Sequence, residues 1–233
     1  MNNNTIEMKQ APYSDLIAMN EPHLPLILLL DCSGSMKGRP LEELLEGYNN
    51  FISQTAQDDL AAKRVDLAVM SFSGSGIQPI MDFTPLSQSA EMSPLSLKAE
   101  GCTPMGEAIV KGIRMLRDRC RIYDEAGIAH FGGWLVMLTD GQPSDDLTAA
   151  TELIRQREEA GRLKFFSIAV NNANVEILQS LGKRVIQSTA QDNFKGIFNW
   201  MSESMVIVSA SRVSDNPQLP PLPEDVRIIP SDW

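Results

Sequence analysis

The sequence predicts a doubly wound α/β fold, in which a central, mostly parallel β-sheet carries helices on both faces and one antiparallel strand at an edge. Two observations lead to this prediction. A continuous apolar run at residues 26–30 and further mostly apolar runs at 134–139 and 163–170 are typical of strands that a parallel sheet buries on both faces. Between these runs lie longer stretches in which apolar residues recur at helical spacing. Strands that alternate with helices in this way specify a parallel sheet between helical layers.

The strand at 26–30 is followed by an amphipathic helix. Pro40 fits the first turn of this helix, where the amide hydrogen that proline lacks has no partner within the helix. We expect the helix to pack on the sheet through apolar residues that recur at helical spacing, namely Leu41, Leu44, Leu45, Tyr48, Phe51 and Ile52.

The next segment supplies the antiparallel edge. Residues 65–72 form a strand, the Gly-Ser-Gly turn at 74–76 reverses the chain, and residues 77–83 return as its hairpin partner. We expect residues 85–94, which begin and end with proline, to form a loop.

A second helix begins near Pro104 and Glu107 and presents Ile109, Ile113 and Leu116 on one face. After it, residues 119–131 are expected to form a long connector to the strand at 134–139. We expect Asp145 to cap a further helix that runs to about residue 160. The remaining expected elements are a strand at 163–170, a helix at 175–181, a strand at 184–188 and a helix at 194–208.

Composition narrows the class of protein. The longest apolar run, residues 24–30, is far shorter than the ~20 residues that span a bilayer, so we expect no membrane segment. The first ten residues lack the basic and apolar regions of a signal peptide, and Cys32, Cys102 and Cys120 cannot all pair with one another. Both observations favour a cytoplasmic protein. The net charge of −10 argues against nucleic acid as the main partner and favours a cation or a basic protein surface.

The pattern divides the chain into three parts. Residues 1–22 are a polar lead-in, residues 23–210 are the α/β domain, and residues 211–233 are a proline-rich C-terminal segment. The last part retains apolar anchors such as Val226 and Ile228, so we expect it to dock in extended form on this domain or on a partner. One further hypothesis is autoinhibition, in which Glu224, Asp225 or Asp232 reaches a metal site as an internal ligand.

Oxygen-bearing side chains follow or precede three of the expected elements. Asp31, Ser33 and Ser35 alternate directly after the strand at 26–30, Thr103 precedes a helix, and Asp140 follows the strand at 134–139. Ligands bind beyond the carboxyl ends of the strands in an open parallel sheet, so these side chains can converge. Carboxylates and hydroxyls are hard donors that suit Mg²⁺ rather than zinc.

Each of these residues also has a structural interpretation. Asp31, Ser33 and Ser35 are ordinary loop residues, Thr103 can cap the helix that follows it, and Asp140 can belong to a turn. Asp140 ends a buried strand, where a carboxylate without a partner is costly. Both interpretations stay open on these residues alone, and Thr103 can serve both roles.

Three segments carry a resemblance to a known family. The stretches "DCSGS" (31–35), "GCTPMGEAI" (101–109) and "VMLTDGQPSD" (136–145) resemble, in this order, the metal-ion-dependent adhesion site of the von Willebrand factor type A family. All five coordinating positions match, and the resemblance spans about residues 23–208. It implies a Rossmann-like fold and an Mg²⁺ or Mn²⁺ ion held directly by Ser33, Ser35 and sometimes Thr103, while Asp31 and Asp140 act largely through water.

The resemblance also implies a function. A partly neutralised ion takes an Asp or Glu of a protein partner as its next ligand, which makes the domain a metal-dependent interaction module. The opening "LPLILLLDCSGSM", the loop "LTDGQPSD" and the proline-rich end are similar to bacterial stand-alone members associated with tellurite resistance. That similarity implies a stress-response setting with kinase and phosphatase partners. An adaptor subunit of an AAA+ ATPase is the alternative.

An enzyme is the competing class. Asp31 occupies the position of the nucleophile in haloacid-dehalogenase-like phosphatases, but Ser33 stands where that family needs a second Asp. As a hydrolase nucleophile, Ser33 lacks a Gly-x-Ser-x-Gly setting, and no histidine follows His130. We expect no catalysis, small buried packing roles for Cys32 and Cys102, and structural or exposed positions for both histidines, His23 and His130.

Overall fold

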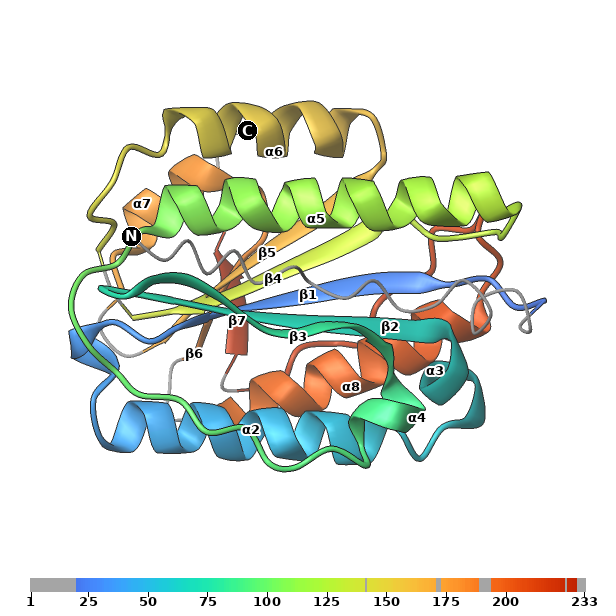
Figure 1. Ribbon diagram of the computed structural model, residues 1–233, viewed down its shortest axis with the longest axis horizontal. Coiled ribbons are helices and arrows are strands. Elements are labelled where there is room, and N and C mark those ends of the chain that lie inside the picture. The colour runs from blue at the N-terminus through green and yellow to red at the C-terminus, as the bar shows by residue number, and fades with distance from the viewer. Residues whose placement is uncertain (1–19, 141, 171–172, 189–193, 225, 230–233) are drawn as a thin grey trace, which may run out of the picture.

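The computed structural model describes residues 20–140, 142–170, 173–188, 194–224 and 226–229, and a seven-stranded sheet forms its centre (Figure 1). The strands are β1 (Leu24–Asp31), β2 (Val65–Ser73), β3 (Gly76–Pro85), β4 (Gly133–Thr139), β5 (Leu163–Ala169), β6 (Val185–Ser188) and β7 (Val226–Ile229). Their order is β3-β2-β1-β4-β5-β6-β7. The four central pairings are parallel and the two outer ones antiparallel. The predicted α/β fold with a mostly parallel sheet is confirmed.

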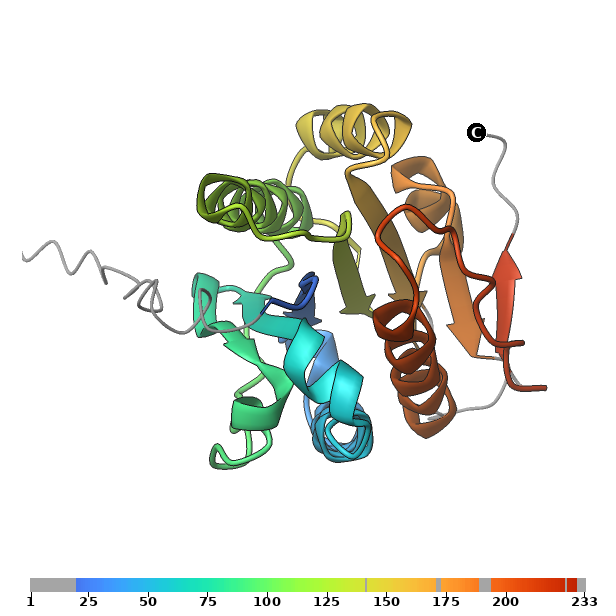
Figure 2. The same cartoon turned by 90° about the vertical axis from the view of Figure 1, so that its right-hand side faces the viewer.

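Helices cover both faces of this sheet (Figure 2). The helical segments are the single 3₁₀ turn η1 (Gly34–Met36), α2 (Arg39–Thr55), α3 (Asp59–Arg64), α4 (Leu86–Ser89), α5 (Met105–Ala126), α6 (Thr148–Glu159), α7 (Val175–Leu181) and α8 (Phe194–Ala210). Helices α2, α3 and α8 lie on one face, and α5, α6 and α7 on the other.

Two apolar clusters form the core, one on each face of the sheet. Along β1, Leu26 and Leu28 pack toward α2 and α8, whereas Ile27 and Leu29 pack toward α5, and all four are fully buried. This alternation follows from the two-residue repeat of a strand. It explains why this segment is apolar at every position, and each such side chain contributes roughly 1.5 to 3 kcal/mol.

The prediction of a single antiparallel edge strand was incomplete. The hairpin strand β3 lies where it was expected, but β7 pairs antiparallel with β6 and forms a second antiparallel edge. The indole N–H of Trp200 donates to the Pro220 carbonyl at 3.0 Å, and Leu219 and Leu222 pack against the core. These contacts return the chain to the sheet, so residues 211–224 and 226–229 dock on the domain.

The expected connector at 119–131 was wrong in its first part, because α5 continues to Ala126. Arg119 and Tyr123 are buried on this helix and hydrogen-bond to Asp66 of β2, which His23 also contacts at 3.0 Å. Burial alone raises the pKa of Asp66, but its bonds with His23 and Arg119 outweigh burial and leave this pKa lowered. A buried charge on the inward face hid the helical pattern, and Gly127, with φ +69°, ends the helix.

Two further boundaries differ from the prediction. Asp145 does not cap α6, which begins at Thr148; its carboxylate instead accepts the Gly106 and Glu107 amides at 3.1 and 2.8 Å, at the start of α5. Within the expected loop at 85–94, residues Leu86–Ser89 form the short helix α4. In the described part of the chain, no helix combines the length and apolar character needed to cross a bilayer. Residues 1–19 of the expected lead-in, together with Asp225 and Asp232, lie outside the described residues.

Candidate metal centre

The candidate site lies at the carboxyl ends of β1 and β4, the two adjacent strands at which the sheet order reverses. β2 follows β1 on one side, and β4 pairs with β1 on the other. In open α/β sheets, ligands bind at such a switch point, beyond the carboxyl ends of the strands. Asp31 is the last residue of β1 and Asp140 directly follows β4. The expected convergence of these two strand ends is present.

Asp31 forms the buried floor of the site. Its Oδ1 accepts the backbone amide of Ser33 at 2.8 Å, and its Oδ2 accepts a hydrogen bond from the Thr139 hydroxyl. Burial raises the pKa of Asp31, although the bonds from Thr139 and Ser33 oppose this effect. Both carboxylate oxygens already have donors, so Asp31 orients the loop around Ser33. This arrangement suits an indirect role toward a cation.

Ser33, Ser35 and Asp140 form a continuous chain of oxygen atoms. The Ser33 and Ser35 Oγ atoms lie 3.0 Å apart, and the Ser35 hydroxyl donates to Asp140 Oδ1 at 2.7 Å. In an octahedral Mg²⁺ shell with bonds of about 2.0 to 2.1 Å, neighbouring ligand oxygens lie about 2.8 to 3.0 Å apart. The spacing of these side chains therefore fits adjacent positions in such a shell.

Thr103, the last of the five candidate ligands, is positioned where the chain at Gly101 crosses the chain at Gly74. The Gly34 amide donates to the Gly101 carbonyl at 3.0 Å, and the Gly74 amide donates to the Glu100 carbonyl at 3.0 Å. A Cβ at Gly101 would stand 2.6 Å from the Gly74 Cα, which is closer than real Cβ contacts allow. The backbone at Gly101 also has φ +66°, so glycine is required here for both reasons.

The segment at 101–103 is held on its other side by the loop after β4. The amide of Thr103 donates to the Ser144 hydroxyl at 3.1 Å, and the Ser144 amide donates to the Thr103 carbonyl at 2.9 Å. Thr103 was expected to cap α5, but the N-cap position belongs to Pro104 and the carboxylate of Asp145 binds the free amides. The hydrogen bonds of Thr103 with other described residues run through its backbone amide and carbonyl, which leaves its hydroxyl available as a ligand.

The donor set explains what this site can bind. Asp31, Ser33 and Thr103 are buried, while Ser35 is exposed and Asp140 is partly so. Within the described ranges no group of three or more His, Cys, Asp or Glu side chains is arranged to hold a metal ion, and this site contributes only two carboxylates. Neutral hydroxyls therefore dominate, which suits a hard cation that keeps positive charge for a further ligand.

The two cysteines beside the site differ from each other. Cys32 is buried as expected, and burial raises the pKa of its thiol to about 12, so it stays protonated. The expectation of a buried Cys102 was wrong, because this residue is exposed on the segment that crosses Gly74.

Sequence reasoning missed the residues that support the site. Thr139 binds Asp31, Ser144 binds Thr103, and Gly74 admits the crossing segment. Only Thr139 left a signal, because it is a polar residue at the end of a buried strand. The contacts of Ser144 and Gly74 depend on segments that are distant in sequence.

Most of the chain matches one known protein family. Residues 26–200, three quarters of the chain, match the von Willebrand factor type A domain. The chain belongs to this family. Von Willebrand factor type A domains typically mediate metal-dependent protein–protein interactions and are usually not catalytic. No curated protein matches this chain in sequence.

Solved structures share the fold at low sequence identity. The pilus adhesin SpaC from Lactobacillus rhamnosus GG, in its open conformation, is 15% identical with a TM-score of 0.62, and the match covers 82% of this chain and 31% of SpaC. The PilB minor pilin from Streptococcus sanguinis is 13% identical with a TM-score of 0.61 over 80% of this chain and 62% of its own. The manganese-loaded TRAP protein of Plasmodium vivax is 20% identical with a TM-score of 0.51, covering 68% of this chain and 61% of TRAP. The chain thus spans about a third of SpaC, and these likenesses establish the fold alone.

Proposed function

We propose that this von Willebrand factor type A domain binds Mg²⁺ or Mn²⁺ at the carboxyl ends of β1 and β4 and uses the ion to recognise an acidic residue of a protein partner. The observation that carries the proposal is the spacing of the Ser33, Ser35 and Asp140 oxygens, 3.0 and 2.7 Å apart along the chain. The TRAP protein of Plasmodium vivax, which shares this fold, is loaded with manganese, and this is consistent with such an ion here.

Each residue has a distinct role in this proposal. Ser33 and Ser35 supply neutral oxygen ligands, and Thr103 adds a third hydroxyl from the opposite loop. Asp31 holds the Ser33 backbone through its Oδ1, and Asp140 lies at the exposed rim beside Ser35. The bound ion supplies positive charge that these hydroxyls do not cancel.

A partner carboxylate is the ligand that best completes this arrangement. Mg²⁺ binds oxygen and keeps open positions for ligands from outside the protein. The chain itself is acidic, with a net charge of −10, so an acidic partner is repelled unless a cation stands between the two surfaces. The metal therefore makes binding both possible and selective, and no catalytic step is part of the proposal.

For the cellular setting we propose a cytoplasmic, bacterial stress-response system similar to tellurite resistance, with kinase or phosphatase partners. The support is the sequence similarity at residues 24–36 and 138–145 and the docked proline-rich segment. An adaptor role in an AAA+ ATPase complex is the second candidate. Affinity purification with Mg²⁺, followed by mass spectrometry, distinguishes these partner classes.

Calorimetric titration with Mg²⁺ tests the metal site. We expect saturable binding to the wild type, and a loss of at least about tenfold in affinity for Ser35→Ala and for the pair Ser33→Ala with Asp140→Ala. Ser180→Ala on α7 is the matched control, because it removes an exposed hydroxyl that bonds within its own helix and not to any of the five candidate ligands. Equal Mg²⁺ affinity in all four proteins contradicts the proposal.

A further inference from the structure

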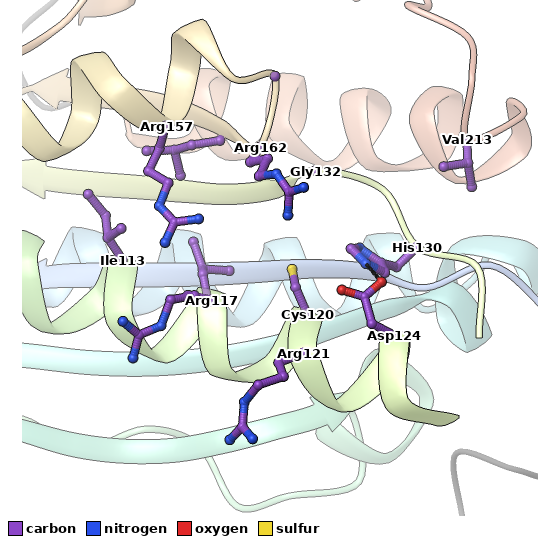
Figure 3. A pocket seen from close by; sticks show the side chains of 13 residues that line it. Ile113, Arg117, Cys120, Arg121, Asp124, His130, Gly132, Arg157, Arg162 and Val213 are labelled. Carbon is purple, nitrogen blue, oxygen red and sulfur yellow. Dashed lines mark hydrogen bonds and ion pairs between the residues drawn. The ribbon is translucent and has the colours of Figure 1, made fainter. Parts of the chain in front are cut away.

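A second pocket lies at the end of the sheet opposite the candidate metal centre. It is a cavity of about 420 Å³ between α5 and α6, where β4 and β5 begin, and its walls include Gly132, Leu163 and Cys120 (Figure 3). Its volume falls within the ~300 to 1,000 Å³ that is typical of small-molecule sites. None of the five candidate metal ligands lines it.

Four arginines give this pocket its character, namely Arg117 and Arg121 of α5, Arg157 of α6, and Arg162 just before β5. The chain has 30 acidic and 20 basic residues, yet among the described residues the only carboxylate that lines this cavity is Asp124. A concentration of positive charge in one hollow of an acidic protein raises the local potential for anions.

The arginines differ in how much of their charge is already paired. Arg117 contacts Asp118 and Arg121 contacts Glu125, at 2.9 and 3.1 Å, and all four side chains are about half exposed, so these pairs are weak. Arg157 and Arg162 make no ion pair with any other described residue. Figure 3 shows the side chains of Arg157 and Arg162 extending toward α5, and Cys120 of α5 pointing into the cavity.

His130 neutralises the charge of Asp124, the one carboxylate of the described cavity wall. Its Nδ1 lies 2.9 Å from the Phe131 carbonyl oxygen and its Nε2 lies 3.2 Å from Asp124 Oδ1. A carbonyl and a carboxylate can only accept hydrogen bonds, so both ring nitrogens carry protons and the imidazole is positively charged. The charges of His130 and Asp124 offset each other, Cys120 also hydrogen-bonds to His130, and the four guanidinium groups supply the remaining positive charge of the described cavity wall.

We propose that this pocket binds a phosphate-type dianion, with Arg157 and Arg162 as its direct ligands and Arg117 and Arg121 at its rim. Guanidinium groups present paired N–H donors that match the oxygens of a phosphate in bidentate geometry. A bound dianion also relieves the mutual repulsion of the four arginines. The site is independent of the proposed metal-dependent function, because it lies at the other end of the sheet.

The dianion has two possible sources, a free phosphate and a phosphorylated side chain of a protein. Calorimetry with inorganic phosphate, and separately with a neutral peptide that carries one phosphoserine, distinguishes them. EDTA in the buffer prevents phosphate from binding through a metal ion at the opposite end. A constant chloride concentration, near 0.15 M, screens non-specific attraction beyond about 8 Å.

The test compares a double variant with a single-site control variant, both in the full chain. Arg157→Gln with Arg162→Gln removes the direct ligands, whereas Arg155→Gln removes a charge from the same helix α6 at a side chain that pairs with Glu152 and Glu159 and does not line the cavity. We expect the double variant to lose at least about tenfold in affinity for the tighter probe, and Arg155→Gln to bind as the wild type does. Amide shifts at Gly132 and Leu163 on titration locate the bound probe.

The relative affinities of the two probes distinguish a free phosphate from a phosphorylated protein. Tighter binding of the phosphopeptide than of inorganic phosphate assigns a phosphorylated protein partner, and equal or weaker binding of the peptide assigns a free phosphate. The proposal is overturned if neither probe binds the wild type saturably, or if the double variant binds as tightly as Arg155→Gln. The direct ligands reach solvent, and equal thermal midpoints without phosphate verify that the variants fold.

Discussion

Replacing Gly101 by alanine tests how the candidate metal centre is assembled. This substitution touches no proposed ligand, but its Cβ would stand 2.6 Å from the Gly74 Cα and 3.1 Å from the Gly74 nitrogen. Both are backbone atoms, so the crossing segments must separate. Overpacking of this kind costs about 1 to 3 kcal/mol, and the positive φ of +66° adds about 1 to 2 kcal/mol. We expect a total loss of about 2 to 5 kcal/mol in the free energy of unfolding.

A second glycine separates the two contributions. Gly127 has φ +69°, and nothing lies within 4 Å of a Cβ added there. Gly127→Ala therefore carries the backbone cost alone, about 1 to 2 kcal/mol. Urea denaturation measures the stability of both variants, and Mg²⁺ calorimetry measures their metal affinity. Gly101→Ala displaces Thr103 and weakens Mg²⁺ binding by at least about tenfold, whereas Gly127→Ala leaves it unchanged. Equal losses of stability and equal Mg²⁺ affinities in the two variants would refute this reasoning.

Two further predictions concern the opposite ends of α5. The hydrogen bond with Cys120 and those with Phe131 and Asp124 raise the pKa of His130 to about 9 from an ordinary value of 6.5. Stability from the charged ring is therefore fully present below pH 6.5 and is lost as the pH rises through about 9. For this half-buried group we expect a loss of about 1 to 2 kcal/mol in the free energy of unfolding, measured by urea denaturation. In His130→Gln we expect the free energy of unfolding to stay constant over the same pH range. Asp145→Ala removes the carboxylate that caps α5 and should lower stability by about 1 kcal/mol, and a thermal midpoint equal to that of the wild type would contradict the capping role.

The sequence predicts the centre of this fold better than its margins, for a physical reason. Strands β1, β4 and β5 are almost entirely buried on both faces, so a mostly apolar run of the right length admits few other structures. The second half of α5 was missed because Arg119 faces inward toward Asp66, and a local pattern treats a charged residue as exposed. β7 was missed because its partner β6 lies about 40 positions earlier in the chain.

For the candidate site too, residues next to buried strands were predictable from the sequence, and contacts between distant segments were not. Asp31 and Asp140 were predictable because each follows a buried strand, and the order of β1 and β4 in a parallel sheet brings their ends together. The serines followed from Asp31 through a short, continuous loop. The Gly74–Gly101 crossing and the bonds of Ser144 to Thr103 join segments that sequence spacing does not relate. The pocket lined by four arginines was likewise not predictable from sequence spacing, because its two halves come from α5 and from the end of α6 with the connection to β5.

The most direct test of the metal-dependent account is to locate a paramagnetic ion by nuclear magnetic resonance. Substoichiometric Mn²⁺ broadens the amide signals of residues close to it. The account predicts broadening centred on residues 31–35, 101–103 and 138–140, its removal by excess Mg²⁺, and its absence in Ser33→Ala with Asp140→Ala. Broadening that is centred on other acidic segments, or that persists in this variant, would contradict the assignment of the metal to this site.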